Sequence, residues 1–166
     1  MRVALITIVF VFVVSGFLVV SGFSRMTHAQ SPTDRERQAI LKVVQTFFDT
    51  VTARDIDGAR EILVPQGRFH AMRAGSEPRS LSNEEYLAQL QASKQTMRER
   101  IWNPDVRVHG AIATMWAPYD FWIDGKLSHC GVDAFDLIKT DKGWKIAGGV
   151  YTLESKCEPS PLGPLK

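Results

Sequence analysis

Residues 111–139, AIATMWAPYDFWIDGKLSHCGVDAFDLIK, predict the long β-hairpin on which the fold depends. Apolar and aromatic residues are dense on both sides of Asp124-Gly125. This pair favours a two-residue hairpin turn, because both central positions of such a turn need a positive φ. A second turn at residues 140–143, TDKG, leads into residues 144–154, WKIAGGVYTLE. We therefore expect a meander of long antiparallel strands in the C-terminal half.

The residues before this meander predict three helices and a short hairpin. Apolar residues recur at helical spacing between positions 32 and 53. Asp55 can cap a second helix that ends near Pro65, and Ser82 with Glu85 forms a capping box for a third. The hairpin turns near Gly75. Helices followed by antiparallel strands predict an α+β fold in which helices cover one face of a curved sheet. The third helix is expected to bury Tyr86, Leu87, Leu90 and Met97.

The register of the long hairpin brings polar groups together among aromatic residues. If Ile123 pairs with Lys126, then Asp120 lies opposite His129 and Trp116 lies opposite Asp133. A bulge at Pro118 would exchange the faces of the residues before it. Without such a bulge, one face of the hairpin is expected to hold Trp116, Asp120, Trp122, Leu127, His129, Asp133, Phe135 and Leu137.

This mixture of groups indicates a candidate site. Buried polar groups are costly unless they are hydrogen-bonded, so the carboxylates and the imidazole either satisfy each other or line a cavity. His129 is the candidate for proton transfer, with Asp120 or Asp133 orienting it. The alternative is that Asp120 and His129 form a hydrogen bond between strands while Asp133 is solvated.

The N-terminus has the layout of an export signal. Met1 and Arg2 precede an apolar run at 3–20, and small residues at Thr27 and Ala29 favour cleavage after position 29. Residues 1–29 are thus a predicted signal peptide, and the protein is predicted to be secreted or periplasmic. The alternative is a membrane anchor formed by residues 3–20, whose length approaches that of a spanning helix.

The two cysteines and the charge balance are consistent with an exported domain. An oxidising compartment favours a disulfide between Cys130 and Cys157, with two separate thiols as the alternative. Removing Arg2 and Arg25 leaves equal numbers of basic and acidic residues, so no nucleic-acid partner is implied. No zinc-site spacing or phosphate-binding loop is evident, and we expect neither metal nor cofactor.

Residues 116–146, WAPYDFWIDGKLSHCGVDAFDLIKTDKGWKI, resemble the nuclear transport factor 2-like (SnoaL-like) superfamily, in particular its "putative lumazine-binding" type. The resemblance extends over about residues 33–157. It implies a cone in which a strongly bent, mostly antiparallel sheet wraps three N-terminal helices around a deep pocket. This domain would occupy residues 30–158, with an irregular tail at 159–166. The resemblance also implies a homodimer through the outer sheet face, which we expect to expose Ala117, Tyr119, Phe121, Ile123 and Val132.

The fold alone leaves three functions open. The first is a binding protein for a small hydrophobic molecule. The second is an acid–base enzyme, such as an isomerase, dehydratase or cyclase, in which His129 moves the proton. The third is an interaction module. The predicted ligand-binding residues are Trp116, Trp122, Phe135, Tyr86 and His70, although Tyr86 could instead be a core residue and His70 a surface residue.

Overall fold

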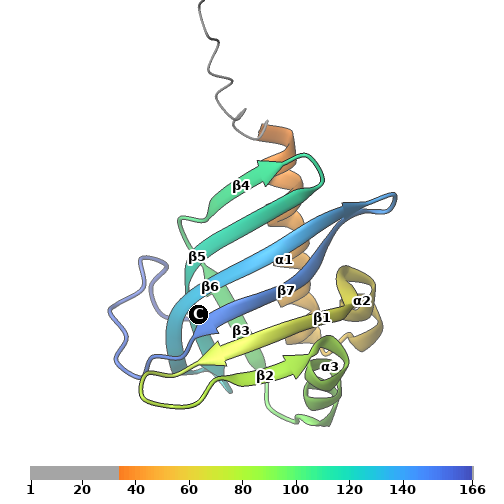
Figure 1. Cartoon of the computed structure of the whole chain (residues 1–166). Coiled ribbons are helices and arrows are strands. Elements are labelled where there is room, and N and C mark those ends of the chain that lie inside the picture. The colour runs from red at the N-terminus through yellow and green to blue at the C-terminus, as the bar shows by residue number, and fades with distance from the viewer. Residues whose placement is uncertain (1–33, 166) are drawn as a thin grey trace, which may run out of the picture.

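A computed structural model describes residues 34–165, so the predicted signal segment lies outside the described part of the chain. In this part, three helices lie against a curled, mixed seven-stranded sheet, which confirms the predicted α+β cone (Figure 1). No helix within residues 34–165 is long and apolar enough to cross a membrane.

The second and third helices begin where their capping residues predict, and the first lies within the range that its apolar spacing predicts. Helix α1 is Asp34–Ala53, and α2 is Ile56–Ile62 with Asp55 as its N-cap. Helix α3 is Asn83–Ala92, and the capping box of Ser82 and Glu85 is present. The prediction that Met97 extends the inner face of α3 is wrong. The helix ends at Ala92, and Met97 begins a strand instead.

The sheet has the strand order β2-β1-β7-β6-β5-β3, and β4 also pairs with β5. Strands β1 and β7 are parallel, whereas the other pairs are antiparallel. The short hairpin is β1 and β2, which turns near Gly75 as expected. Pro65 and Gly67 lie inside β1 and do not close α2. The strands are β1 Leu63–Met72, β2 Arg79–Ser82, β3 Met97–Ile101, β4 Asp105–His109, β5 Ile112–Ile123, β6 Lys126–Thr140 and β7 Gly143–Thr152.

A bulge at Ser128 corrects the predicted register of the long hairpin. Ile123 pairs with Lys126 across the expected turn, but Trp122 pairs with Leu127 and Phe121 with His129. Ser128 is therefore an extra residue in β6. Beyond it, every pair is displaced by one position, so Asp120 faces Cys130 and Asp133 faces Ala117. The β5 residues predicted to share a face with His129 and Asp133 therefore lie on the opposite face, and the β5 residues predicted for that opposite face share a face with them.

Pro118 causes no bulge, because it lies where the neighbour of β5 changes. Strand β4 pairs with β5 up to Trp116, and β3 pairs with it from Tyr119 onward. The carbonyl of Pro118 accepts a hydrogen bond from the Trp102 N–H. In an antiparallel strand the N–H of a residue points to the same side as its carbonyl. The position at which proline lacks an N–H therefore faces the gap between β3 and β4.

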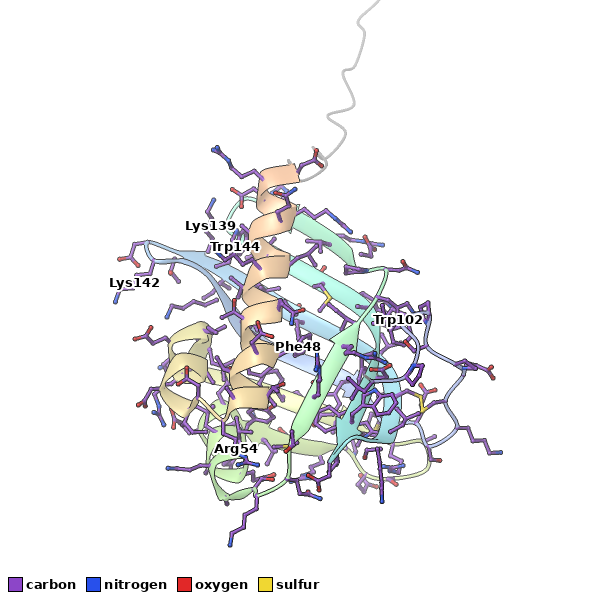
Figure 2. All side chains as sticks on the ribbon, turned by 180° about the vertical axis from the view of Figure 1, so that it is seen from behind. Phe48, Arg54, Trp102, Lys139, Lys142 and Trp144 are labelled. Atoms are coloured by element: carbon purple, nitrogen blue, oxygen red, sulfur yellow. A yellow bond between two sulfur atoms is a disulfide. The ribbon has the colours of Figure 1, made fainter. Side chains whose placement is uncertain are left out.

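Helix α1 crosses the concave face of the sheet and supplies the core (Figure 2). Its predicted apolar stripe is buried, with Ile40 and Val44 fully inaccessible. Phe47 and Phe48 both pack against Phe135 of β6. Near the start of α1, Glu36 accepts hydrogen bonds from Lys139 and from the Trp144 indole. This contact fixes the start of the helix to the β6–β7 hairpin.

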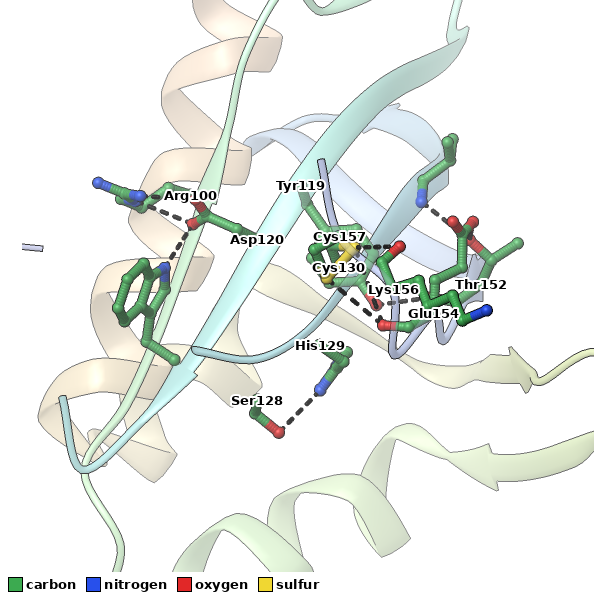
Figure 3. The surroundings of a disulfide bond; sticks show 12 residues. Arg100, Tyr119, Asp120, Ser128, His129, Cys130, Thr152, Glu154, Lys156 and Cys157 are labelled. Carbon is green, nitrogen blue, oxygen red and sulfur yellow. Dashed lines mark hydrogen bonds and ion pairs between the residues drawn. A yellow bond between two sulfur atoms is a disulfide. The ribbon is translucent and has the colours of Figure 1, made fainter. Parts of the chain in front are cut away.

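The convex face carries a buried ion pair between Arg100 and Asp120 (Figure 3). Arg100 of β3 donates to both carboxylate oxygens of Asp120, at 2.8 and 2.5 Å, and Asp120 also accepts from the Trp122 indole. Arg100 donates further to the carbonyl of Gly163 in the tail. The disulfide between Cys130 and Cys157 ties the start of this tail to β6.

The surface predicted for a homodimer also changes. Ala117 and Tyr119 are buried on the concave side, so they cannot form an exposed outer patch. Trp116, Ile112 and Val150 are among the large apolar side chains exposed on the convex face, and Ala134 pairs with both Trp116 and Val150. The sheet-to-sheet homodimer stays a prediction, with this group of residues as its centre.

The buried pair predicts a large effect of one substitution. Asp120→Ala should lower the free energy of unfolding by about 2–4 kcal/mol, because it leaves the largely buried Arg100 charge without its partner. Asp105→Ala breaks the exposed pair with Arg107 and should cost less than about 1 kcal/mol. Urea titrations of both variants test this. Equal losses would show that the pair adds nothing beyond a surface contact.

Candidate functional site

A cavity of about 230 Å³ opens between the concave face of the sheet and the helices. Residues from α1, α3 and all strands except β4 contribute to its wall. Most of them are aromatic or apolar, while the polar ones are two carboxyl groups, three phenols, one imidazole and one guanidinium. The lining residues are Phe47, Phe69, Ala71, Arg79, Tyr86, Met97, Glu99, Tyr119, Phe121, His129, Asp133, Phe135, Tyr151 and Leu153.

Two carboxyl groups meet at this cavity. Alternation along β3 places Met97, Glu99 and Ile101 on the concave side, whereas Arg100 points to the convex side. Asp133 of β6 is 2% exposed, and its carboxyl group is within hydrogen-bonding reach of Glu99. Two ionised carboxylates cannot hydrogen-bond to each other, because both only accept. The contact therefore requires a proton shared between Glu99 and Asp133.

Burial is the main cause of this protonation. It raises the pKa of Glu99 well above its usual range, and the negative charge of Asp133 raises it further. Burial also raises the pKa of Asp133, while the hydrogen bond from Glu99 opposes that rise. Both effects follow from the cost of placing charge in an apolar environment and next to a like charge. The carboxyl pair accordingly retains a proton at pH values where exposed carboxyl groups are ionised.

One oxygen of this pair lacks a partner. Asp133 Oδ2 is buried and accepts no hydrogen bond from any residue in the described part of the chain. A buried acceptor without a donor costs about 1–3 kcal/mol, and more when it is charged. Because Asp133 lines the cavity, a bound molecule with a donor group can supply the missing hydrogen bond.

Three tyrosines surround the pair as neutral phenols. Burial raises the pKa of Tyr86, Tyr119 and Tyr151, and the charges of Glu99 and Asp133 raise each of them further. The Tyr119 hydroxyl donates to the carbonyl of Thr152 at 2.6 Å. All three therefore keep their protons at neutral pH.

His129 lines the cavity but does not have the predicted partner. Its ring stacks on Phe121 with the centroids 4.8 Å apart, and Nδ1 lies 3.1 Å from Ser128 Oγ (Figure 3). Burial lowers the pKa of His129, and the positive charge of Arg73 lowers it further. The imidazole is thus neutral near pH 7, and within residues 34–165 no carboxylate stabilises its protonated form.

The structure separates the predicted site residues into two groups. Asp133, His129, Phe135 and Tyr86 line the cavity together. Asp120, Trp116 and Trp122 lie on the convex face, because the Ser128 bulge displaces the register between β5 and β6. The predicted contact of Asp120 with His129 is therefore wrong. His70 is also outside the cavity, since it is exposed and pairs with Val150 on the convex side of β1.

Sequence reasoning missed Glu99, which is the partner of Asp133. The stretch MRERI, residues 97–101, alternates apolar and charged residues in a way that predicts a strand with Arg98 and Arg100 on one face. Glu99 then shares the apolar face with Met97 and Ile101. A carboxyl group in that position was the signal for the site. Tyr119 was missed because the register between β5 and β6 was displaced, and Tyr151 was missed because no face was assigned to the residues of β7.

No group of three or more His, Cys, Asp or Glu side chains within residues 34–165 is arranged to hold a metal ion. The groups of the cavity wall that can act on a bound molecule include its protonated carboxyl pair and its neutral phenols.

The carboxyl pair predicts an unusual dependence of stability on pH. Its folded-state pKa values are raised, so the folded protein binds more protons than the unfolded chain, and stability falls as the pH rises through these values. Glu99→Gln removes one of the titrating groups. The free energy of unfolding of this variant, measured by urea titration from about pH 5 to about pH 8, should fall less steeply than that of the wild type, by up to about 1.4 kcal/mol per pH unit.

The matched control is Glu77→Gln in the exposed turn between β1 and β2. It should follow the wild-type pH dependence. Parallel curves for the wild type and Glu99→Gln would show that Glu99 is ionised in the folded protein.

Solved structures share the cone. A protein of unknown function with a cystatin-like fold from Nostoc punctiforme has a TM-score of 0.63 at 12% identity, over 80% of this chain and 99% of that one. A "putative dehydratase" of the nuclear transport factor 2-like family from Streptomyces avermitilis gives 0.61 at 15%, over 74% and 99%. A "putative aromatic ring hydroxylase" from Novosphingobium aromaticivorans gives 0.60 at 20%, over 72% and 89%. These likenesses concern the fold alone.

Comparison with functionally curated proteins gives no match. The family model described as "putative lumazine-binding" matches residues 35–152, which run from the start of α1 to the end of β7. This match includes every element of the cone and all but one of the residues around the cavity. The chain has the fold of nuclear transport factor 2-like proteins, and it belongs to the family described as "putative lumazine-binding".

Proposed function

We propose that this protein binds a small, largely apolar molecule in the cavity between helices and sheet. The observation that carries the proposal is a cavity lined by aromatic side chains with a few convergent polar groups, one of which is a buried acceptor without a donor. Such a combination is typical of sites for small molecules, in which apolar walls supply affinity and polar groups fix orientation. The family description and the shared cone are consistent with a binding or enzyme-like role.

The volume and the wall limit what can bind. A cavity of about 230 Å³ has room for a molecule of one or two fused rings. Phe47, Phe69 and Phe135 form a mutually packed aromatic cluster, with Phe47 and Phe69 stacked at 5.7 Å between centroids. A flat ring can contact this cluster without reordering it, which keeps the cost of binding low.

The proposal places the protein outside the cytoplasm. Support comes from the sequence of residues 1–29, which has the layout of an export signal, and from the Cys130–Cys157 disulfide, which persists in oxidising compartments.

Filling the cavity should abolish binding without unfolding the protein. Ala71 lines the cavity, so Ala71→Leu should weaken binding of the neutral probe 1-naphthylmethanol by at least about tenfold through loss of space. Ala134→Leu places the same added volume on the convex face and should leave the affinity within about twofold of wild type. Fluorescence titration of the purified full chain measures both.

Equal affinity in all three proteins would show that the probe binds elsewhere. No binding to the wild type, together with native mass spectra of protein from its own host that carry no small molecule, would contradict a binding function.

The carboxyl pair favours a second function, acid–base chemistry on the bound molecule. A pair with one proton offers a donor and an acceptor within one site, and raised pKa values keep that state near neutral pH. In this function Asp133 removes a proton from the substrate and Glu99 returns one, while His129 remains neutral and serves as part of the wall.

An acid–base enzyme should exchange hydrogen between its substrate and water. The molecule recovered from the native complex and incubated with protein in deuterated water should gain deuterium at a carbon position, detected by mass spectrometry. Asp133→Asn should stop this exchange, whereas Asp136→Asn, an exposed change on the same strand, should not. A molecule returned without deuterium would leave binding as the function.

A further inference from the structure

We propose that the ligand is a small organic amine, which binds as a cation with its nitrogen at Asp133 and its apolar body among the aromatic rings of the cavity. This inference rests on the proposed binding function and names the chemical class of the ligand.

The unpartnered oxygen of Asp133 sets the first requirement. Asp133 is 2% exposed and lines the cavity, and its Oδ2 accepts no hydrogen bond from residues 34–165. The Asp133 carboxyl group also contacts the carboxyl group of Glu99. A donor group on a ligand can complete the hydrogen bonding of Oδ2. An ammonium group provides up to three donors, and hydrogen bonds between charged groups are roughly twice as strong as neutral ones.

The charge around the pair sets the second requirement. A carboxyl pair that has lost one of its two protons carries a negative charge, and a buried charge is tolerated only when it is paired. The one basic side chain that lines the cavity in the described part of the chain is Arg79, apart from the neutral His129. Arg79 is exposed on the edge strand β2, and its guanidinium donates to Gln89 Oε1 at 2.6 Å. The negative charge of the carboxyl pair can therefore be paired by a cationic group of the ligand.

The aromatic wall sets the third requirement. Phe69 packs against Tyr86 with 5.2 Å between ring centroids, and the rings of Tyr119 and Phe121 pack against His129. The face of an aromatic ring is negative, so rings around a desolvated ammonium stabilise it by about 2 kcal/mol or more. An anionic ligand would face the same rings and carboxyl groups unfavourably.

Amine binding should depend on pH, because the pair must give up a proton to receive a cation. Affinity for the amine should rise from about pH 5 to about pH 8 as the pair loses that proton. The other ionisable groups facing the pair are Tyr86 on α3, Tyr119 on β5, Tyr151 on β7, His129 on β6 and Arg79 on β2, while Asp120 acts on Glu99 from the convex face. Loss of a positive charge from His129 would raise the affinity for the amine in the same direction, so the Asp133→Asn variant is needed to assign the pH dependence to the pair.

Two matched probes test the proposal. 1-Naphthylmethylamine and 1-naphthylmethanol have nearly the same shape and differ in charge. With the full wild-type chain at about pH 8, fluorescence titration should give at least about tenfold tighter binding of the amine, and the advantage should shrink toward pH 5. Equal affinities, or tighter binding of the anion 1-naphthoate, would overturn the proposal while leaving the binding function intact. Failure of both the amine and the alcohol to bind would instead contradict the proposed function itself.

Three variants assign the effect to the pair. Asp133→Asn should remove the preference for the amine and keep the affinity for the alcohol, which also shows that the variant is folded. Asp136→Asn on the same strand should behave as wild type. Glu99→Gln removes the competing acid and retains a donor to Asp133, so it should keep the preference and move its pH dependence to lower pH. A preference for the amine that survives in Asp133→Asn would overturn the proposal.

Discussion

The extra residue Ser128 in β6 determines which side chains meet inside the cone. Without it, Asp120 would face His129 on the concave side, as simple counting from the Asp124-Gly125 turn predicts. With it, Phe121 stacks on His129, Asp120 faces Cys130, and Asp133 lies beside Ala117 within reach of Glu99. Because side chains alternate between the two faces of a sheet, a one-residue shift in register changes which residues of the partner strand share a face with each later side chain. The composition of both faces therefore follows from this bulge.

Asp120 and Asp133 are equally buried and have opposite environments. Both are 2% exposed, and they lie on opposite faces of the same sheet. Asp120 accepts hydrogen bonds from Arg100 and from the Trp122 indole, so its charge is paired and the group stabilises the fold. Asp133 has a second acid as its partner and one oxygen without a donor. Asp120 is fully paired, whereas one oxygen of Asp133 has no donor in the described part of the chain. The free-energy cost of that missing hydrogen bond therefore lies at the cavity.

The sequence predicted the elements of this fold better than their contacts. Helix caps at Asp55 and Ser82, the turn at Asp124-Gly125 and the apolar stripe of α1 are local signals, and the structure confirms each of them. Of the site, His129, Asp133 and Phe135 were predicted to share a face because alternation within one strand does not depend on register. Tyr119 was missed because its position depends on pairing across strands, whereas Glu99 shares the apolar face of residues 97–101 and could have been found from alternation alone. A bulge with no Gly or Pro to mark it leaves no local signal at Ser128.

The difference between Asp120 and Asp133 also limits how a buried acid can be interpreted. A carboxyl group in an aromatic strand predicts a chemical role at both positions, but burial alone does not distinguish an ion pair from a site. The partner of the acid makes this distinction, and for Asp120 that partner, Arg100, lies in a stretch whose alternation can be read from the sequence. Alternation in MRERI places Arg100 on the convex face and Glu99 on the concave face of the same strand. The acid opposite a basic residue is structural, and the acid near another acid is the one whose proton can respond to a ligand.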